Sequence, residues 1–401
     1  MAMTAIDQLN DLVDWENGYV SSAIHFDEEI YKVELQRVFE RSWLLVGHAD
    51  MVPTPGSFVT NYMGEVPVII TRDNTNGIRV LVNRCAHRGN QVCLFDRGQT
   101  RGFVCSYHGW SYGLDGALTG VPIEQHVYPD GLDKSKHGLE TVRVANFHGL
   151  IFATFDANAP SLEDWLGEDT IWYLEHFVLS LDLGGLELLP GFHRYYSPGN
   201  WKLNAENFIG DNYHVFVATH VAWLAVCRDF VERGIAVPMT TYPTGDGSTL
   251  YEISTGLKKG SVPVGMGLVI ADDVGFKRDF EGAQRLGPEA VEWVEHRYNV
   301  LQNLQKDRET KMYGFMNAGI FPNISLMGFL SPMLGRHFQL WHPRGVRAHE
   351  GWQWTMVEKD APQVVKDIAI QRVYQGSTWR GGGTRRCREL RTHRGRFCTA
   401  T

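Results

Sequence analysis

The chain has 401 residues, of which 43% are apolar and 21% charged, as is usual for a globular protein with more than one domain. Its formal net charge of −8 gives no support for nucleic-acid binding. The first 30 residues lack a basic start followed by an apolar run, and no apolar stretch reaches membrane-spanning length. We therefore expect a cytoplasmic protein that binds neither nucleic acid nor membrane.

The first third of the chain predicts one helix and then a small β module. Apolar residues recur at helical spacing over residues 27–43, with acids in the first turn. Turn-forming segments rich in Pro and Gly separate strand-like runs over residues 43–47, 58–63, 66–71 and 78–83. Asp115-Gly116 predicts a hairpin. These pieces predict an antiparallel β module from residue 44 to residue 155, ending in an apolar strand over residues 149–155.

Two short segments in this module each contain one cysteine and one histidine. The first, C-A-H-R-G, holds Cys85 and His87, and the second, C-S-Y-H-G-W, holds Cys105 and His108. In a Rieske [2Fe–2S] centre two Cys bind one iron and two His bind the other. A structural zinc site and an accidental spacing are the alternatives, but zinc fingers usually pair like ligands, whereas each segment here is mixed. The sequence therefore predicts a Rieske centre, with Tyr107 and Trp110 packed over it.

The remaining cysteines show no paired spacing and predict no disulfide framework: Cys93, Cys227, Cys387 and Cys398.

The rest of the chain predicts a second, larger domain. Helices are predicted from a capping pattern at Ser161 to about residue 181, over residues 288–311, and from Asp360 onward. Strands are predicted over residues 186–196, 324–329, 337–342 and 351–357. Residues 244–267 are rich in Gly and Pro and predict a loop. No dinucleotide fingerprint is present, so electrons must come from other proteins.

A second motif occupies residues 200–220, N-W-K-L-N-A-E-N-F-I-G-D-N-Y-H-V-F-V-A-T-H. Asn207, Asp211 and His214 share one face of an ideal helix. His220 lies about 120° further round, so both imidazoles reach one metal only if the helix ends or distorts between them. Two His and one carboxylate form the facial triad of non-haem Fe(II) oxygenases. A buried core histidine is the alternative for this spacing alone, but a Rieske motif in the same chain favours the iron site.

With C-A-H-R-G, C-S-Y-H-G-W and this second motif together, the chain resembles the α subunit of Rieske non-haem iron aromatic-ring-hydroxylating dioxygenases, from about residue 11 to about residue 376. The resemblance implies that His214 and His220 bind the mononuclear iron. It implies that Asp211 bridges a Rieske histidine of one subunit and an iron-binding histidine of its neighbour, and that Asn207 lies near the iron.

The resemblance also implies a fold and a division into domains. The fold is α+β, with a small antiparallel β Rieske domain inserted into a helix-grip catalytic domain, a curved antiparallel sheet around a long helix. The expected domains are residues 44–155 for the Rieske domain, residues 1–43 and 156–376 for the catalytic domain, and residues 377–401 for an atypical tail. Candidate pocket residues, each of which ordinary core packing would equally explain, are Phe208, Phe321, Leu326, Met327 and Phe329.

The implied reaction is cis-dihydroxylation of an aromatic ring with O₂ and with electrons from NAD(P)H. A reductase and a ferredoxin would deliver these electrons to one [2Fe–2S] cluster and one Fe(II) per subunit. A trimeric α ring with a small β subunit is implied as well. The rival interpretations are a Rieske monooxygenase or demethylase, and an electron-transfer Rieske protein with an impaired second site.

The resemblance fails over residues 377–401. The family takes its third iron ligand from an aspartate in an acidic C-terminal stretch, whereas residues 380–401 here hold seven Arg and one acid, Glu389. A basic tail can bind nucleic acid or membrane, but this one lacks helical periodicity. Our hypothesis is that the reading frame shifts near Gly376, so that the tail is translated in the wrong frame. Resequencing the locus would contradict this hypothesis if no other frame encoded an acidic continuation. Two neutral His alone would hold iron weakly.

Overall fold

The computed structural model describes residues 11–14, 16–209, 251–254, 266–271, 273–307, 313–328, 333 and 335–379. Its strands are β1 (Val13–Asp14), β2 (Tyr19–Val20), β3 (Leu44–His48), β4 (Ser57–Met63), β5 (Val66–Arg72), β6 (Ile78–Val82), β7 (Arg97–Gln99), β8 (Phe103–Val104), β9 (Ser111–Tyr112), β10 (Leu118–Gly120), β11 (Arg143–Phe147), β12 (Leu150–Thr154), β13 (Leu186–Leu188), β14 (His193–Pro198), β15 (Tyr251–Ser254), β16 (Met266–Ala271), β17 (Gly314–Ile320), β18 (Ile324–Met327), β19 (Arg336–Pro343) and β20 (Ala348–Glu358).

Its longer helices are α1 (Glu28–Glu34), α2 (Glu124–Val127), α3 (Leu162–Leu166), α4 (Glu168–Tyr173), α5 (Lys202–Ile209), α7 (Asp273–Leu286), α8 (Pro288–Leu304) and α9 (Gln363–Trp379). The π-helical segments η3 (Leu35–Phe39) and η6 (Leu174–Val178) continue α1 and α4. In the part of the chain that is described, no helix combines the length and the apolar character needed to cross a membrane.

The helix predicted over residues 27–43 is confirmed only as far as Phe39. Asp27 caps α1, because its carboxylate accepts hydrogen bonds from two backbone N–H groups of the first turn, at 2.8 and 3.0 Å. Trp43, the expected last helical residue, instead lies buried just before β3 and donates its indole N–H to the Pro160 carbonyl at 3.1 Å. The prediction was too long because tertiary packing of Trp43 overrides local helix periodicity.

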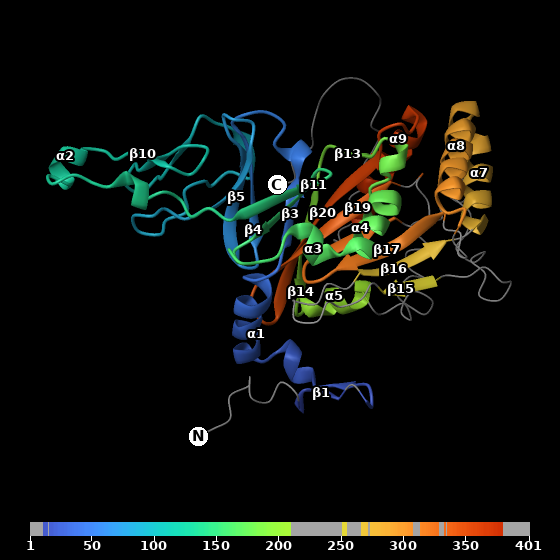
Figure 1. Cartoon of the computed structure of the whole chain (residues 1–401), viewed down its shortest axis with the longest axis horizontal. Coiled ribbons are helices and arrows are strands. Elements are labelled where there is room, and N and C mark those ends of the chain that lie inside the picture. Colours follow the sequence, from blue (N-terminus) through green and yellow to red (C-terminus); the bar gives the residue numbers. More distant parts are fainter. Residues whose placement is uncertain are drawn as a thin grey trace.

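The predicted β module consists of three small antiparallel sheets, ordered β6-β5-β4-β7, β10-β9-β8 and β11-β12-β3. Each strand predicted before residue 84 is present within one or two residues of its expected bounds. The hairpin at Asp115-Gly116 joins β9 to β10, and Gly116 takes the φ of +87° that favours glycine there. The sheet that contains β10, together with helix α2, projects to one side of the molecule, away from the larger sheet (Figure 1).

The larger domain is organised around one antiparallel sheet ordered β13-β20-β19-β18-β17-β16-β15, with β14 also paired to β20. Its first face packs against α3, α4 and η6, and the buried side chains there include Leu174, Phe177, Phe338 and Trp354. Because side chains alternate along a strand, His349 of β20 lies on the opposite face, where its imidazole Nε2 contacts the Asn204 amide of α5 at 2.6 Å. Helices and strands together confirm an α+β fold.

Several predicted elements are broken or displaced in the larger domain. The helix expected from Ser161 to residue 181 is interrupted at Gly167, where φ is +79°. The strand expected over residues 186–196 is interrupted at Gly191, where φ is +99°. A positive φ is compatible with neither a regular helix nor a regular strand.

Other predictions were wrong about the type or the start of an element. The loop expected over residues 244–267 contains β15 and the beginning of β16, which pair with each other. Pairing between segments distant in sequence stabilises such strands despite weak local propensity. Helix α7 had no prediction, whereas α8 lies within the predicted helix at residues 288–311. Helix α9 begins at Gln363, three residues later than the expected Asp360 cap.

Candidate metal sites

The two segments that carry the Rieske motif fold as matching turns. The backbone N–H of Cys85 donates to the Asn90 carbonyl at 2.8 Å, and that of Cys105 donates to the Trp110 carbonyl at 2.8 Å. In both turns the cysteine carbonyl accepts from a glycine N–H at 2.9 Å, and these glycines have φ of +74° and +72°. A left-handed glycine therefore lets each short turn present its Cys and its His on the same side.

The turns bring the four predicted ligands together. The imidazole rings of His87 and His108 have centroids 4.6 Å apart and are inclined by 71°. The Cys85 thiol is close enough to the Cys105 thiol to favour its ionisation, and both cysteines are buried. The Nδ1 atom of His87 is buried and has no hydrogen-bond partner within the protein. A buried imidazole nitrogen without a partner fits a metal-bound one.

Aromatic side chains hold the imidazoles in place. Trp110 is buried and stacks on His87, with ring centroids 4.9 Å apart and an interplanar angle of 7°. Tyr107 packs against His108 at a centroid distance of 3.9 Å but is 61% exposed. Trp110 thus orients one imidazole from the protein interior, while Tyr107 lies on the outer surface of the other.

The surroundings favour the metal-binding forms of these side chains. Burial opposes ionisation of the Cys105 thiol, but backbone N–H groups of Tyr107 and His108 and the Asn90 amide outweigh it, so its pKa is lowered. Burial is also the main cause that lowers the pKa of His87, followed by the His108 imidazole. Thiolate and neutral imidazole are the forms that bind metal.

The donor set therefore fits a Rieske cluster. No group of three or more His, Cys, Asp or Glu side chains suited to a single metal ion occurs among the residues described. That result is compatible with a Rieske cluster, because each of its irons binds only two protein side chains.

Two further contacts to the sulfur atoms were not anticipated from the sequence. The Tyr112 hydroxyl lies 3.1 Å from Cys85 Sγ, and the Asn90 amide nitrogen lies 3.6 Å from Cys105 Sγ. Tyr112 is the inward residue of the short strand β9, seven positions after Cys105. Alternation of inward and outward side chains along the predicted hairpin could have identified Tyr112 as inward-facing, but it could not have identified Tyr112 as a partner of Cys85.

Replacing Tyr112 with phenylalanine is expected to lower the reduction potential of the cluster. A hydrogen bond to a cluster sulfur stabilises the more electron-rich reduced state. A bond of about 1 kcal/mol corresponds to roughly 40 mV for a one-electron couple. Redox titration of the purified protein checks this. Tyr128→Phe is the matched control, because Tyr128 packs against Trp110, at 6.4 Å, and makes no contact with a sulfur atom; equal potentials in both variants would contradict the role of Tyr112.

The second motif is only partly described. Asn207 lies half-buried on α5, whereas Asp211, His214 and His220 lie outside the described residues. Helix α5 is held at its start by Asn200, whose side-chain amide donates to the Val346 carbonyl at 2.7 Å and whose side-chain oxygen accepts from the Lys202 N–H at 3.0 Å. Asn200 thus ties the start of α5 to the turn between β19 and β20.

The candidate pocket residues do not form one group. Leu326 belongs to the main core on the first face of the sheet, which favours the core interpretation for it. Phe321 is half-buried and packs against Trp201 with ring centroids 5.7 Å apart. Met327 is half-buried in β18. Phe329 and the side chain of Phe208 lie outside the described residues.

Two protein families match the chain. The Rieske [2Fe-2S] domain matches residues 42–141, and the ring hydroxylating alpha subunit (catalytic domain) matches residues 186–378. The biphenyl 2,3-dioxygenase subunit alpha of Rhodococcus jostii is 35% identical over 374 residues, which are 93% of this chain and 76% of that protein. The large oxygenase component of the naphthalene 1,2-dioxygenase system of Pseudomonas aeruginosa is 36% identical over 356 residues, which are 88% of this chain and 74% of that protein.

Solved structures show the same likeness. A naphthalene 1,2-dioxygenase with indole bound in its active site superposes with a TM-score of 0.70 at 34% identity, over 89% of this chain and 76% of that one. A quaternary ammonium Rieske monooxygenase superposes with a TM-score of 0.59 over 89% of this chain and 80% of that one, but at 16% identity it shows a shared fold only.

Proposed function

The chain belongs to the family of Rieske aromatic-ring-hydroxylating dioxygenase α subunits, and from this premise we propose that it is the α subunit of a multicomponent dioxygenase. The proposed reaction is cis-dihydroxylation of an aromatic ring with O₂, the electrons coming from NAD(P)H through a reductase and a ferredoxin. The observation that carries the proposal is the convergence of two Cys and two His on matching turns.

In this proposal each turn contributes one ligand to each iron of the cluster. Cys85 and Cys105 bind the first iron as thiolates, and His87 and His108 bind the second iron through neutral imidazoles. His214 and His220 bind a separate Fe(II). When bound, the cluster supplies single electrons and the ferrous ion supplies the site for O₂.

The protein's own residues orient these ligands and limit access of water. Stacking on Trp110 holds the plane of His87, and burial of both cysteines keeps water from their sulfur atoms. Asn207, on the described part of α5, lies one helical turn before Asp211 in sequence and would share its face. A carboxylate at Asp211 would accept a hydrogen bond from the N–H of a ligand imidazole and so orient that ring.

Features of the tip of the β module support an assembly of several chains. Large apolar side chains are exposed around the ligand turns, at Val104, Tyr107, Ile123 and Val127. Clustered exposed apolar groups of this kind mark protein interaction sites. We propose that this tip faces the catalytic domain of a neighbouring α subunit in a trimeric ring, with Asp211 as the bridge, and that a small β subunit completes the assembly.

The proposed catalytic domain is of the helix-grip type. Its antiparallel sheet carries α5 on one face, and α9 packs against β20 through a small cluster that includes Leu189, Val357 and Ala369. In this fold the curved sheet would wrap around a long helix. The helix proposed to carry the iron ligands would then lie between the sheet and the substrate.

The proposal is tested by measuring iron and acid-labile sulfide after anaerobic Fe(II) loading and desalting. A filled catalytic site gives about three irons to two sulfides, and His214→Ala reduces this to about two to two. Turnover of naphthalene or biphenyl with ¹⁸O₂, ferredoxin and reductase then separates a dioxygenase, which inserts two labelled atoms, from a monooxygenase, which inserts one. Zinc without sulfide would overturn the proposal.

A second candidate function follows from the C-terminal sequence. The only acid after Asp367 is Glu389, so the third iron ligand of the family has no counterpart there. A ratio of two irons to two sulfides in the unsubstituted protein would favour an electron-transfer Rieske protein, and restoring an acidic C-terminal segment should then raise the ratio.

A further inference from the structure

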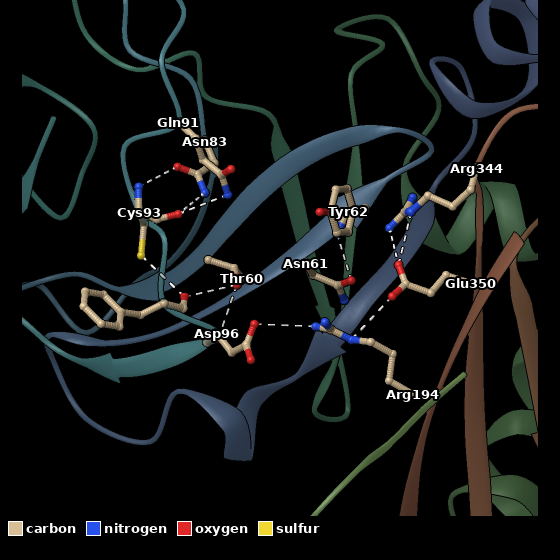
Figure 2. Close-up of polar contacts among 11 residues, drawn as sticks. Thr60, Asn61, Tyr62, Asn83, Gln91, Cys93, Asp96, Arg194, Arg344 and Glu350 are labelled. Atoms are coloured by element: carbon tan, nitrogen blue, oxygen red, sulfur yellow. Dashed lines mark hydrogen bonds and ion pairs between the residues drawn. The ribbon is translucent and has the colours of Figure 1, made fainter. Parts of the chain in front are cut away.

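The β module meets the larger sheet through a group of charged and aromatic side chains that we call the clasp. The module contributes Tyr62 of β4 and Asp96, which precedes β7. The catalytic sheet contributes Arg194 of β14, Arg344, which follows β19, and Glu350 of β20. Figure 2 shows these five side chains along the line where the two units touch.

Glu350 lies between the two arginines and uses both of its oxygens. Its Oε2 accepts from Arg344 Nε at 3.1 Å and from Arg344 Nη2 at 2.6 Å. Its Oε1 faces Arg194 Nε at 3.6 Å. The side chain of Glu350 is 18% exposed, so water screens these pairs less than it screens an ion pair on an open surface.

Each arginine also reaches the module. The Arg344 guanidinium carbon lies 3.9 Å from the centre of the Tyr62 ring, and Arg194 Nη2 lies 3.5 Å from the Asp96 carboxylate. The Arg194 guanidinium carbon lies 4.0 Å above the Trp352 ring. Planar stacking restricts a guanidinium more than an exposed ion pair alone does. The clasp therefore holds the module at two separate points.

The module side of the clasp is connected to the first ligand turn. Asp96 is fixed to β4 because its carbonyl accepts from the Thr60 N–H at 2.9 Å. Asn83, two residues before Cys85, accepts from the Val92 and Cys93 N–H groups at 3.0 and 2.8 Å. Hydrogen bonds therefore hold the segment from Asn83 to Asp96 near both of its ends, as Figure 2 shows, so Asp96 lies on the same hydrogen-bonded segment as the base of this turn.

We propose that the clasp sets the orientation of the Rieske module on its own catalytic domain, with Arg194 and Arg344 as positioning residues. The consequence rests on the proposed α ring, in which the module tip of one chain approaches the iron of the next. In that assembly a bound, reduced cluster would lose one electron to the iron site of the adjacent chain, and O₂ would be the final oxidant. Because electron tunnelling weakens steeply with separation, a tilted module transfers that electron more slowly.

The test measures orientation directly. A nitroxide is attached through a ketone-bearing amino acid placed at Glu163, exposed on α3, and pulsed EPR gives its distance from the reduced cluster in the assembled protein. Arg194→Met with Arg344→Met is expected to shift and broaden the distance distribution. Arg194→Lys alone, which keeps the charge but loses the planar stacking on Trp352, is expected to change the distribution less than the double substitution does. The matched control is Lys136→Met, which removes the Lys136–Asp133 pair, 3.1 Å long, inside the module, and leaves the distribution unchanged.

A kinetic measurement accompanies the distance. With the cluster reduced and naphthalene and O₂ added, the double variant is expected to oxidise its cluster on the order of tenfold more slowly, at unchanged cluster content and potential. A distance distribution in the double variant identical to that of the unsubstituted protein would overturn the clasp. Absence of cluster oxidation in the unsubstituted protein would instead contradict the proposed function, and the distance measurement would still decide the clasp.

Discussion

Replacing Cys105 with serine is expected to abolish the Rieske cluster. A neutral serine hydroxyl is a poor iron ligand, and the lowered pKa of Cys105 reflects N–H donors from Tyr107, His108 and Asn90 that act against burial and suit a thiolate. Acid-labile sulfide should fall to near zero, and the EPR signal of the reduced cluster should disappear. Cys85→Ser is expected to behave in the same way, since in the proposed assignment the two thiolates bind the same iron.

Cys93 provides a matched control in the same module. It is also a buried cysteine, but it lies outside both motif segments and its Sγ lies 3.6 Å from the Phe95 carbonyl. Burial raises the pKa of this thiol, so it stays protonated near neutral pH. Cys93→Ser should therefore keep full sulfide content and the EPR signal. Equal loss in both variants would indicate general damage to the module, and full retention in Cys105→Ser would contradict the ligand assignment.

Replacing Glu358 with alanine is expected to cost about 3–5 kcal/mol of the free energy of unfolding. Glu358 Oε1 accepts from Arg297 Nε at 3.0 Å, from Arg336 Nη2 at 2.7 Å and from Ser180 Oγ at 2.9 Å. The three charged side chains are at most 5% exposed. Without the carboxylate, two guanidinium groups from α8 and β19 would remain buried with reduced compensation. Chemical denaturation of the two proteins measures the difference.

Glu187 supplies the control for this substitution. Its carboxylate pairs with Lys366 Nζ at 2.6 Å, but the two side chains are 41% and 19% exposed, so Glu187→Ala should cost less than about 1 kcal/mol. If Glu358→Ala lost no more free energy of unfolding than Glu187→Ala, the buried cluster of Glu358, Arg297 and Arg336 would not stabilise the fold.

The pH dependence of the Glu358 effect has a definite sign. Burial alone would raise the pKa of this carboxyl, but Arg297 and Arg336 outweigh burial and hold it below its ordinary value. Because the folded-state pKa is lowered, the stabilisation is complete above the unfolded value of about 4.3 and is lost as the pH falls through the folded-state pKa. The difference in free energy of unfolding between Glu358→Ala and the unsubstituted protein should therefore become smaller at acid pH.

Local sequence signals predicted the β module well and the larger domain less well. Ser161 acts as a helix cap, as expected, because an N-cap bond joins residues only two or three positions apart. The strand bounds in the module follow from alternation and from Gly and Pro turns in the same way. Strands β15 and β16 were missed, since pairing with each other and with β17 stabilises them. Helix α7, which packs against the neighbouring helix α8, was missed as well.

The sequence by itself determined the two turns that carry Cys85, His87, Cys105 and His108, because the ligand spacing and the left-handed glycine of each turn are local properties. Tertiary structure decided what surrounds them. The contact between Tyr112 and Cys85 spans 27 positions, that between Arg297 and Glu358 spans 61, and Arg194 contacts Asp96 from another domain. Such partners are chosen by how whole strands and helices pack, which no short pattern in the chain encodes.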